Sequence, residues 1–83
     1  MGVINPAIFI ILERFPESRG KITKLFASSP DFQVLCDDLR QCREALQYWN
    51  RSGKPDALAR RQEYQELHQE LENEIIRFLN DTE

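Results

Sequence analysis

Apolar residues recur at helical spacing between residues 30 and 51. They advance by three and four residues in turn, which is the spacing of an antiparallel coiled-coil seam. The positions of this stripe are Phe32, Leu35, Leu39, Cys42, Leu46 and Trp49. Ser29 suits a helix cap and Pro30 the first helical position, so the helix has a defined start. The pattern predicts a helix over residues 30–51.

A second apolar stripe predicts a helix over residues 55–80. Its positions are Ala57, Tyr64, Leu67, Leu71 and Phe78 in one heptad frame, with Ile75 and Leu79 widening it near the end. Gly53 suits a left-handed helix end and Pro55 a helix start, and so short a connection makes the two helices antiparallel neighbours. The pairs predicted by folding the chain back at Gly53 are Trp49–Ala57, Cys42–Tyr64, Leu39–Leu67 and Leu35–Leu71.

Two shorter segments precede the hairpin, and Phe15-Pro16 separates them, because the residue before a proline is pushed out of the helical region. Residues 6–14 form an apolar segment after Asn5-Pro6, which is a good helix opening. We expect a helix there, although the β-branched residues would also suit a buried strand. Residues 16–28 are expected to form a short amphipathic helix. The predicted fold is an all-α single domain, residues 1–83: an antiparallel, coiled-coil-like helical hairpin with one or two short N-terminal helices packed on it.

A chain of 83 residues buries only a small core, and a two-helix hairpin leaves apolar residues on its outer faces. The uncovered positions are Val34, Tyr48, Leu58, Ile76 and Leu79. The apolar N-terminal segment can cover them, either within one chain or from a partner chain. Because a small core needs further stabilisation, we expect a homo-oligomer, a dimer or higher.

Eleven Lys and Arg against fourteen Asp and Glu give a net charge of −3, which argues against nucleic-acid binding. The charge is unevenly spread. Residues 1–30 carry four basic and two acidic side chains (+2), residues 31–52 three and four (−1), and residues 53–83 four and eight (−4). A basic N-terminal part and an acidic last helix suit antiparallel docking between chains. Solvated helix faces explain the same distribution equally well.

The run from Val3 to Leu12 is apolar apart from Asn5 and Pro6, and its roughly ten residues are too few to cross a bilayer, which needs about twenty. It has no basic residue before it and no small-residue cleavage site after it, so it is a poor signal peptide. We therefore expect no membrane partner and a cytoplasmic location. Peripheral membrane attachment through this run stays an alternative, although the segment lacks basic residues of its own.

A row of glutamates lies on one face of the last predicted helix. Its members are Glu63, Glu66, Glu70 and Glu74. Stacked carboxylates can hold a hard cation, and di-iron bundles use Glu-x-x-His pairs on two helices. The single histidine, His68, has Gln65 three residues before it, so that motif is not met. We interpret the row as a solvated helix face.

Cys36, Cys42 and His68 are the other candidates for chemistry. A Cys–His pair can lower the pKa of the thiol and make a nucleophile or a redox site, and a dimer can pool ligands for a metal. No third orienting group can be named, and Cys42 occupies a seam position. Both cysteines are most simply small buried apolar residues. We therefore expect no enzymatic activity and no cofactor or metal.

Two places suit an interaction surface. Tyr48, Trp49 and Arg51 bring aromatic rings and positive charge together at the hairpin tip, beside Arg40, Arg43, Asn50 and Lys54. The simpler alternative is that Trp49 fills the core beside Ala57. The second place is the apolar N-terminal segment with Ile8, Phe9, Ile11 and Leu12.

The order of features from Phe15 to Leu79 resembles the YdcH-like family of small bacterial helical-hairpin proteins of unknown function. The matching stretches are Ile22-Thr23-Lys24-Leu25, Pro30-Asp31-Phe32-Gln33-Val34-Leu35 and Glu70-Leu71-Glu72-Asn73-Glu74-Ile75. The apolar segment before Phe15 and the Tyr48-Trp49 tip are not part of the family's pattern. The resemblance implies a helical hairpin that associates, with no activity to carry over.

These observations favour a non-catalytic, self-associating helical module that binds an unidentified protein partner. The alternative is a thiol-based redox or metal-responsive protein that uses Cys36, Cys42 and His68.

Overall fold

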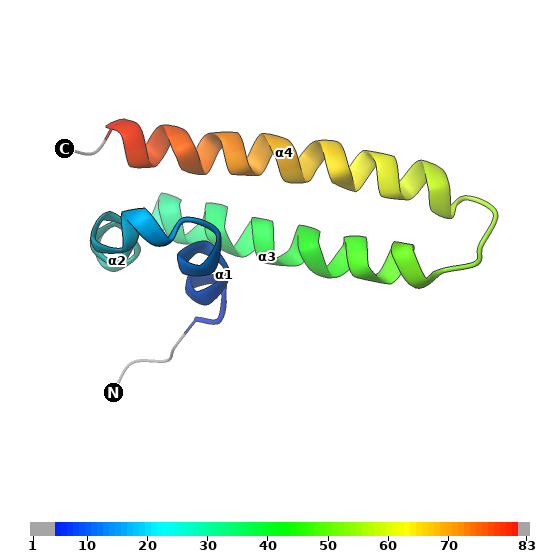
Figure 1. The fold of residues 1–83 in the computed structure, drawn as a ribbon, viewed down its shortest axis with the longest axis horizontal. Coiled ribbons are helices and arrows are strands. Elements are labelled where there is room, and N and C mark those ends of the chain that lie inside the picture. Colours follow the sequence, from blue (N-terminus) through cyan, green and yellow to red (C-terminus); the bar gives the residue numbers. More distant parts are fainter. Residues whose placement is uncertain (1–4, 82–83) are drawn as a thin grey trace.

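A computed structural model describes residues 5–81, and every regular element in that range is helical. The elements are α1 (Ala7–Arg14), the short 3₁₀ helix η1 (Pro16–Ser18), α2 (Arg19–Ser28), α3 (Pro30–Arg51) and α4 (Ala57–Asp81). Helices α3 and α4 form a long antiparallel hairpin, and the three shorter elements gather at its open end (Figure 1). The predicted all-α hairpin with short N-terminal helices is confirmed.

Helix α3 has the limits that its flanking residues predict. The Ser29 hydroxyl accepts a hydrogen bond from the Phe32 N–H at 3.1 Å, and Pro30 occupies the first turn. The predicted left-handed end at Gly53 is wrong, because no described residue has a positive φ. The chain leaves α3 through Ser52 in an extended conformation instead. A turn then follows, in which the Lys54 carbonyl accepts from the Ala57 N–H at 3.1 Å, so α4 begins at Ala57 rather than at Pro55.

The N-terminal segment is a helix and not a strand. The side-chain oxygen of Asn5 accepts a hydrogen bond from the Ala7 N–H at 2.9 Å and so caps α1. The helix ends at Arg14, because Phe15, which precedes Pro16, leaves the helical region. The single helix predicted over residues 16–28 is split into η1 and α2.

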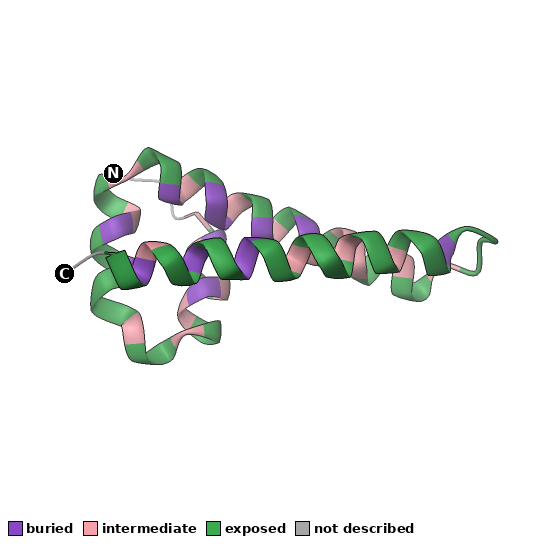
Figure 2. Cartoon of the chain, turned by 90° about the horizontal axis from the view of Figure 1, so that it is seen from above, coloured by how far each residue is buried: buried purple, intermediate pink, exposed green. Residues whose placement is uncertain are grey.

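The core lies where α1 and α2 meet the open end of the hairpin. Its buried residues are Ala7, Ile11, Ile22, Leu25, Phe32, Leu35, Cys36, Leu39, Cys42, Leu71, Ile75 and Leu79. Towards the tip the hairpin is much more exposed (Figure 2). We call residues 43–62 the distal arm, and within them Ala57 is the one buried residue.

The seam of the hairpin keeps the predicted register in its middle. The Cys42 thiol donates a hydrogen bond to the Tyr64 carbonyl oxygen at 3.2 Å, which places these two residues side by side as expected. Leu67 is 41% exposed, whereas the heptad frame predicts a buried seam position. Its neighbour His68 turns inwards instead and is half-buried. The cause is the helical period of 3.6 residues, which drifts away from a strict heptad.

The N-terminal helices are held on α4 by polar contacts as well as by the core. The guanidinium of Arg14 donates to the Glu72 carboxylate, with Nε–Oε2 at 2.6 Å and Nη2–Oε1 at 3.5 Å. The ammonium of Lys21 donates to the Leu79 carbonyl oxygen at 3.0 Å. Glu72 is only 5% exposed, and a buried carboxylate needs such a partner. Both contacts join residues 58 positions apart and fix α1 and α2 on one flank of the hairpin.

The N-terminal helices cover less of the hairpin than we expect from the sequence. Leu79 is buried, whereas the other outer apolar residues remain exposed; these are Val34, Tyr48, Leu58 and Ile76. Tyr48 and Leu58 lie on the distal arm, whereas α1 and α2 contact only the open end of the hairpin (Figure 1). Val34 and Ile76 lie at the open end, on helix faces that α1 and α2 do not cover.

The docking of α1 can be tested by removing one buried side chain. Ile11 is fully buried, so we expect Ile11→Ala to lower the free energy of unfolding by about 2–5 kcal/mol, through lost contacts and an unfilled cavity. Phe9 on the same helix is 57% exposed, and Phe9→Ala is the matched control, with an expected loss below about 1 kcal/mol. Urea unfolding followed by circular dichroism measures both. Equal losses in the two variants would contradict this placement of α1.

Candidate interaction surfaces

The hairpin tip keeps part of the predicted aromatic and basic patch on the surface. Tyr48 is 51% exposed, and its ring meets the half-buried Trp49 edge-on, with centroids 4.9 Å apart. The Lys54 ammonium donates to the Tyr48 hydroxyl at 2.9 Å, and this hydrogen bond raises the pKa of Lys54. A cavity of about 360 Å³ adjoins the patch and is lined by Glu44, Gln47, Tyr48, Arg51 and Ser52. The tip therefore offers an aromatic ring with cations beside it.

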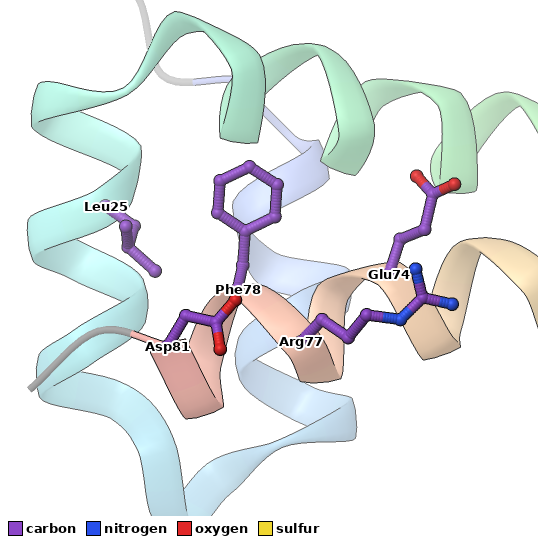
Figure 3. Close-up of a pocket in the computed structure, with 5 residues that line it drawn as sticks. All are labelled: Leu25, Glu74, Arg77, Phe78 and Asp81. Atoms are coloured by element: carbon purple, nitrogen blue, oxygen red, sulfur yellow. The ribbon is translucent and has the colours of Figure 1, made fainter.

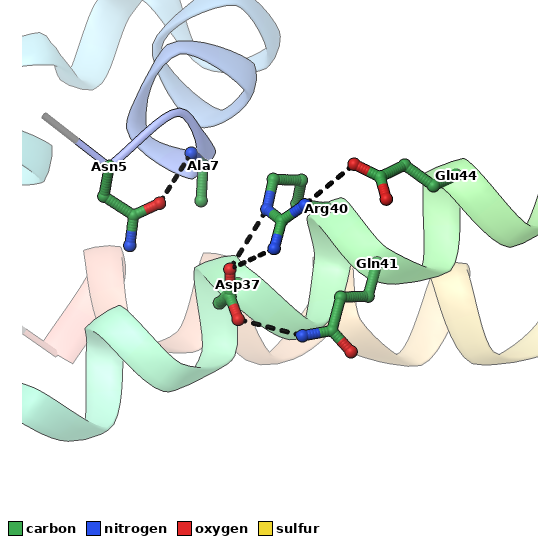
Figure 4. A network of polar contacts seen from close by, with 6 residues as sticks. All are labelled: Asn5, Ala7, Asp37, Arg40, Gln41 and Glu44. Carbon is green, nitrogen blue, oxygen red and sulfur yellow. Dashed lines mark hydrogen bonds and ion pairs between the residues drawn. The ribbon is translucent and has the colours of Figure 1, made fainter.

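Arg40 is not available to this patch, because neighbours on α3 hold its charge (Figure 4). Its Nη2 donates to Asp37 at 2.8 Å and its Nη1 to Glu44 at 2.7 Å, while Asp37 also accepts from Gln41. The hydrogen bonds from Arg40 lower the pKa of the Asp37 carboxyl. The two carboxylates of this network outnumber its one cation, so Arg40 adds no free positive charge to the patch, whereas Arg51 and Lys54 lie beside Tyr48 at the tip.

The predicted N-terminal surface belongs mainly to the core. Ile11 is fully buried, and Ile8 and Leu12 are half-buried against the core cluster. Phe9 alone of the four predicted residues is exposed. Because α1 lies at the open end of the hairpin, the structure does not bring this residue to the tip (Figure 1).

Both cysteines are free and buried. Burial raises the pKa of the Cys36 thiol to about 12, and it also raises the pKa of Cys42, so neither site favours the reactive thiolate. The imidazole of His68 lies beside Glu72, with Nδ1 4.0 Å from Oε1. Within residues 5–81, no group of three or more His, Cys, Asp and Glu side chains could hold a metal ion.

The flank of the hairpin away from α1 carries a surface that our sequence reasoning missed. On α3, one row advances by four and three residues and consists of Val34, Asp38, Gln41, Ala45 and Tyr48. On α4, a row with the same spacing consists of Leu67, Leu71, Glu74, Phe78 and Asp81. The rows face the same side, because Asp38 and Gln41 line a cavity of about 200 Å³ together with Cys42, Leu67 and Leu71. We call this surface the open side.

The open side continues into a larger cavity at the end of the hairpin. This cavity has a volume of about 480 Å³, and its lining residues are Leu25 of α2 with Glu74, Arg77, Phe78 and Asp81 of α4. Leu25 and Phe78 form an apolar floor between α2, α3 and α4, and the charged side chains stand at the rim (Figure 3). Helix α1 lies behind this floor in the same view and leaves it uncovered. We call it the end cavity.

The spacing of Val34 and Tyr48 is the sequence signal that could have revealed the open side. Both are apolar residues outside the α3 seam, and they lie on one helix face. Val34 is 60% exposed, so this face has no cover within the chain.

No family model, curated protein or solved structure matches the chain. The resemblance to the YdcH-like family therefore stays a prediction. Among the described helices, none combines the length and the apolar character that crossing a bilayer requires.

The burial of the two thiols predicts that they do not react with thiol reagents in the folded protein. We expect Ellman's reagent at neutral pH to react with neither cysteine in the folded protein and with both after unfolding in urea, because reaction needs an accessible thiolate. Added zinc should leave both rates unchanged. Rapid reaction of a folded thiol that zinc slows would instead favour the redox or metal-responsive alternative.

The raised pKa of Cys36 also predicts how stability depends on pH. A thiol in an unfolded chain has a pKa of about 8.5, whereas burial raises the pKa of Cys36 in the folded protein to about 12. Between these values the unfolded chain binds fewer protons, so stability falls as pH rises. We expect Cys36→Ala to have a shallower fall than the unchanged protein over this window, measured by urea unfolding at several pH values. Identical slopes would show that Cys36 is ionised in the folded state.

Proposed function

We propose that the protein is a non-catalytic helical module for protein–protein interaction, and that it self-associates. The observation that carries this proposal is the exposure of the distal arm, where two helices bury Ala57 and leave Tyr48 and Leu58 more than half exposed. Helices gain most of their stability from tertiary packing of an apolar face. A two-helix arm with so little buried surface is therefore stabilised by helices from another molecule.

The surfaces described above support binding over catalysis. Both thiols have raised pKa values and are buried, whereas catalytic cysteines sit in electropositive, accessible places. The cavities are lined by mixtures of apolar and charged side chains on helix flanks, which suit contact with another helix. A cytoplasmic location is part of this proposal, since two free buried cysteines suit a reducing compartment.

Self-association is tested on the full chain in solution. We expect sedimentation equilibrium to give a mass of at least twice the 9.8 kDa of one chain. We also expect the thermal midpoint to rise over a roughly hundredfold increase in concentration, because unfolding is then coupled to dissociation. A mass of one chain and a midpoint independent of concentration would refute self-association.

A further inference from the structure

We propose that a second copy of the chain docks antiparallel on the open side, with its hairpin tip seated at the end cavity. This inference rests on the proposed self-association and goes further by naming the surface, the orientation and the contacting residues. Two-fold symmetry makes every contact occur twice, because the tip of each copy meets the end cavity of the other.

Charge is segregated along the hairpin in the way that this arrangement needs. The distal arm, residues 43–62, carries five basic and two acidic side chains, a net charge of +3. Residues 63–81 carry six acidic and one basic side chain, a net charge of −5. A parallel pair would place like charges next to each other, whereas an antiparallel pair brings each basic arm against an acidic stretch. The charges therefore favour the antiparallel orientation.

The apolar residues of the open side agree with the same arrangement. If the two-fold axis passes near Gln41, the middle of the α3 row, Val34 of one copy lies level with Tyr48 of the other. Both side chains are exposed in one chain, at 60% and 51%, and both lie on the row that faces the open side. The pairing buries these apolar surfaces against each other, together with the exposed Leu67 on the neighbouring α4 row.

The tip of the second copy then reaches the end cavity. Phe32 precedes Val34 by two residues on α3, and its ring packs against that of Phe78, with centroids 5.4 Å apart. Phe78 forms the cavity floor with Leu25. Tyr48 of the second copy meets this apolar floor. Lys54, whose ammonium is bonded to the Tyr48 hydroxyl, follows the end of α3 and meets the rim carboxylates of Glu74 and Asp81. Arg77 is the one basic side chain among the residues that line this cavity, against two carboxylates, so the rim has a net negative charge.

The opposite flank does not offer the same surface. There α1 already packs on α3, and the Arg14–Glu72 and Lys21–Leu79 contacts fasten the N-terminal helices to α4. The acidic Glu72 is neutralised within its own chain, whereas Glu74 and Asp81 face the end cavity. A second copy finds uncovered apolar surface next to carboxylates on the open side.

Charge exchange tests the contact between tip and cavity. We expect Lys54→Glu and Asp81→Lys each to raise the dissociation constant of the dimer about tenfold or more, because each puts like charges together. Combining both should bring the constant back to within about threefold of the unchanged protein, since opposite charges face each other again. The matched control combines Lys54→Glu with Glu66→Lys and so makes the same changes of charge. Because Glu66 lies outside the α4 row, this control should not restore the dissociation constant. Sedimentation equilibrium measures all four variants.

Disulfide trapping tests the orientation. We expect Val34→Cys combined with Tyr48→Cys to form a covalent dimer under mild oxidation, and neither single variant to do so, because a disulfide needs Cα atoms within about 7 Å. The native cysteines are buried and do not interfere. Cross-linking of Tyr48→Cys alone would indicate a parallel pair and overturn the proposal. A dimer that ignores the charge exchange would overturn this inference alone, whereas a monomeric chain would overturn self-association with it.

Discussion

The packing of Phe32 is the constraint on which the rest of the fold depends. Its fully buried ring meets Phe26 of α2 edge-on at 6.5 Å and Phe78 of α4 at 5.4 Å, measured between centroids. One side chain therefore joins three helices, and each aromatic pair adds about 0.5–1.5 kcal/mol beyond its buried area. The hydrogen bond from the Phe32 N–H to the Ser29 hydroxyl couples this contact to the start of α3, so the cap and the core specify the same geometry.

Local sequence signals predict the helices well where capping residues and prolines act on their own neighbours. Ser29 and Pro30 specify where α3 starts, and Pro16 specifies where α1 ends. The prediction is wrong at Gly53, because the extended backbone of Ser52 already turns the chain and no left-handed residue is needed. It is also wrong at Leu67, because a heptad frame carried along one helix ignores its drift of about 20° per heptad.

The candidate interaction surfaces were predictable only in part. Sequence reasoning finds a surface whose residues are neighbours in the chain and misses one whose residues are far apart in it. Tyr48 and Arg51 share the tip because they are near neighbours on one helix, so sequence reasoning finds them. The open side combines a row of α3 with a row of α4, and polar residues interrupt the apolar residues of both rows, so neither row stands out in the sequence by itself. Likewise, nothing local links Arg14 with Glu72, which meet only after the N-terminal helices have packed.

Under the proposed self-association, the division between a packed end and an exposed arm links association to folding. The buried residues cluster where four helices meet, whereas the distal arm has a net charge of +3. Repulsion among those cations opposes close packing of the arm by itself, and it is only partly screened over distances below about 10 Å. An acidic neighbouring molecule would replace this electrostatic repulsion with attraction. Under the proposed self-association, the charge distribution that weakens the packing of the arm by itself also makes the arm selective for an acidic partner surface.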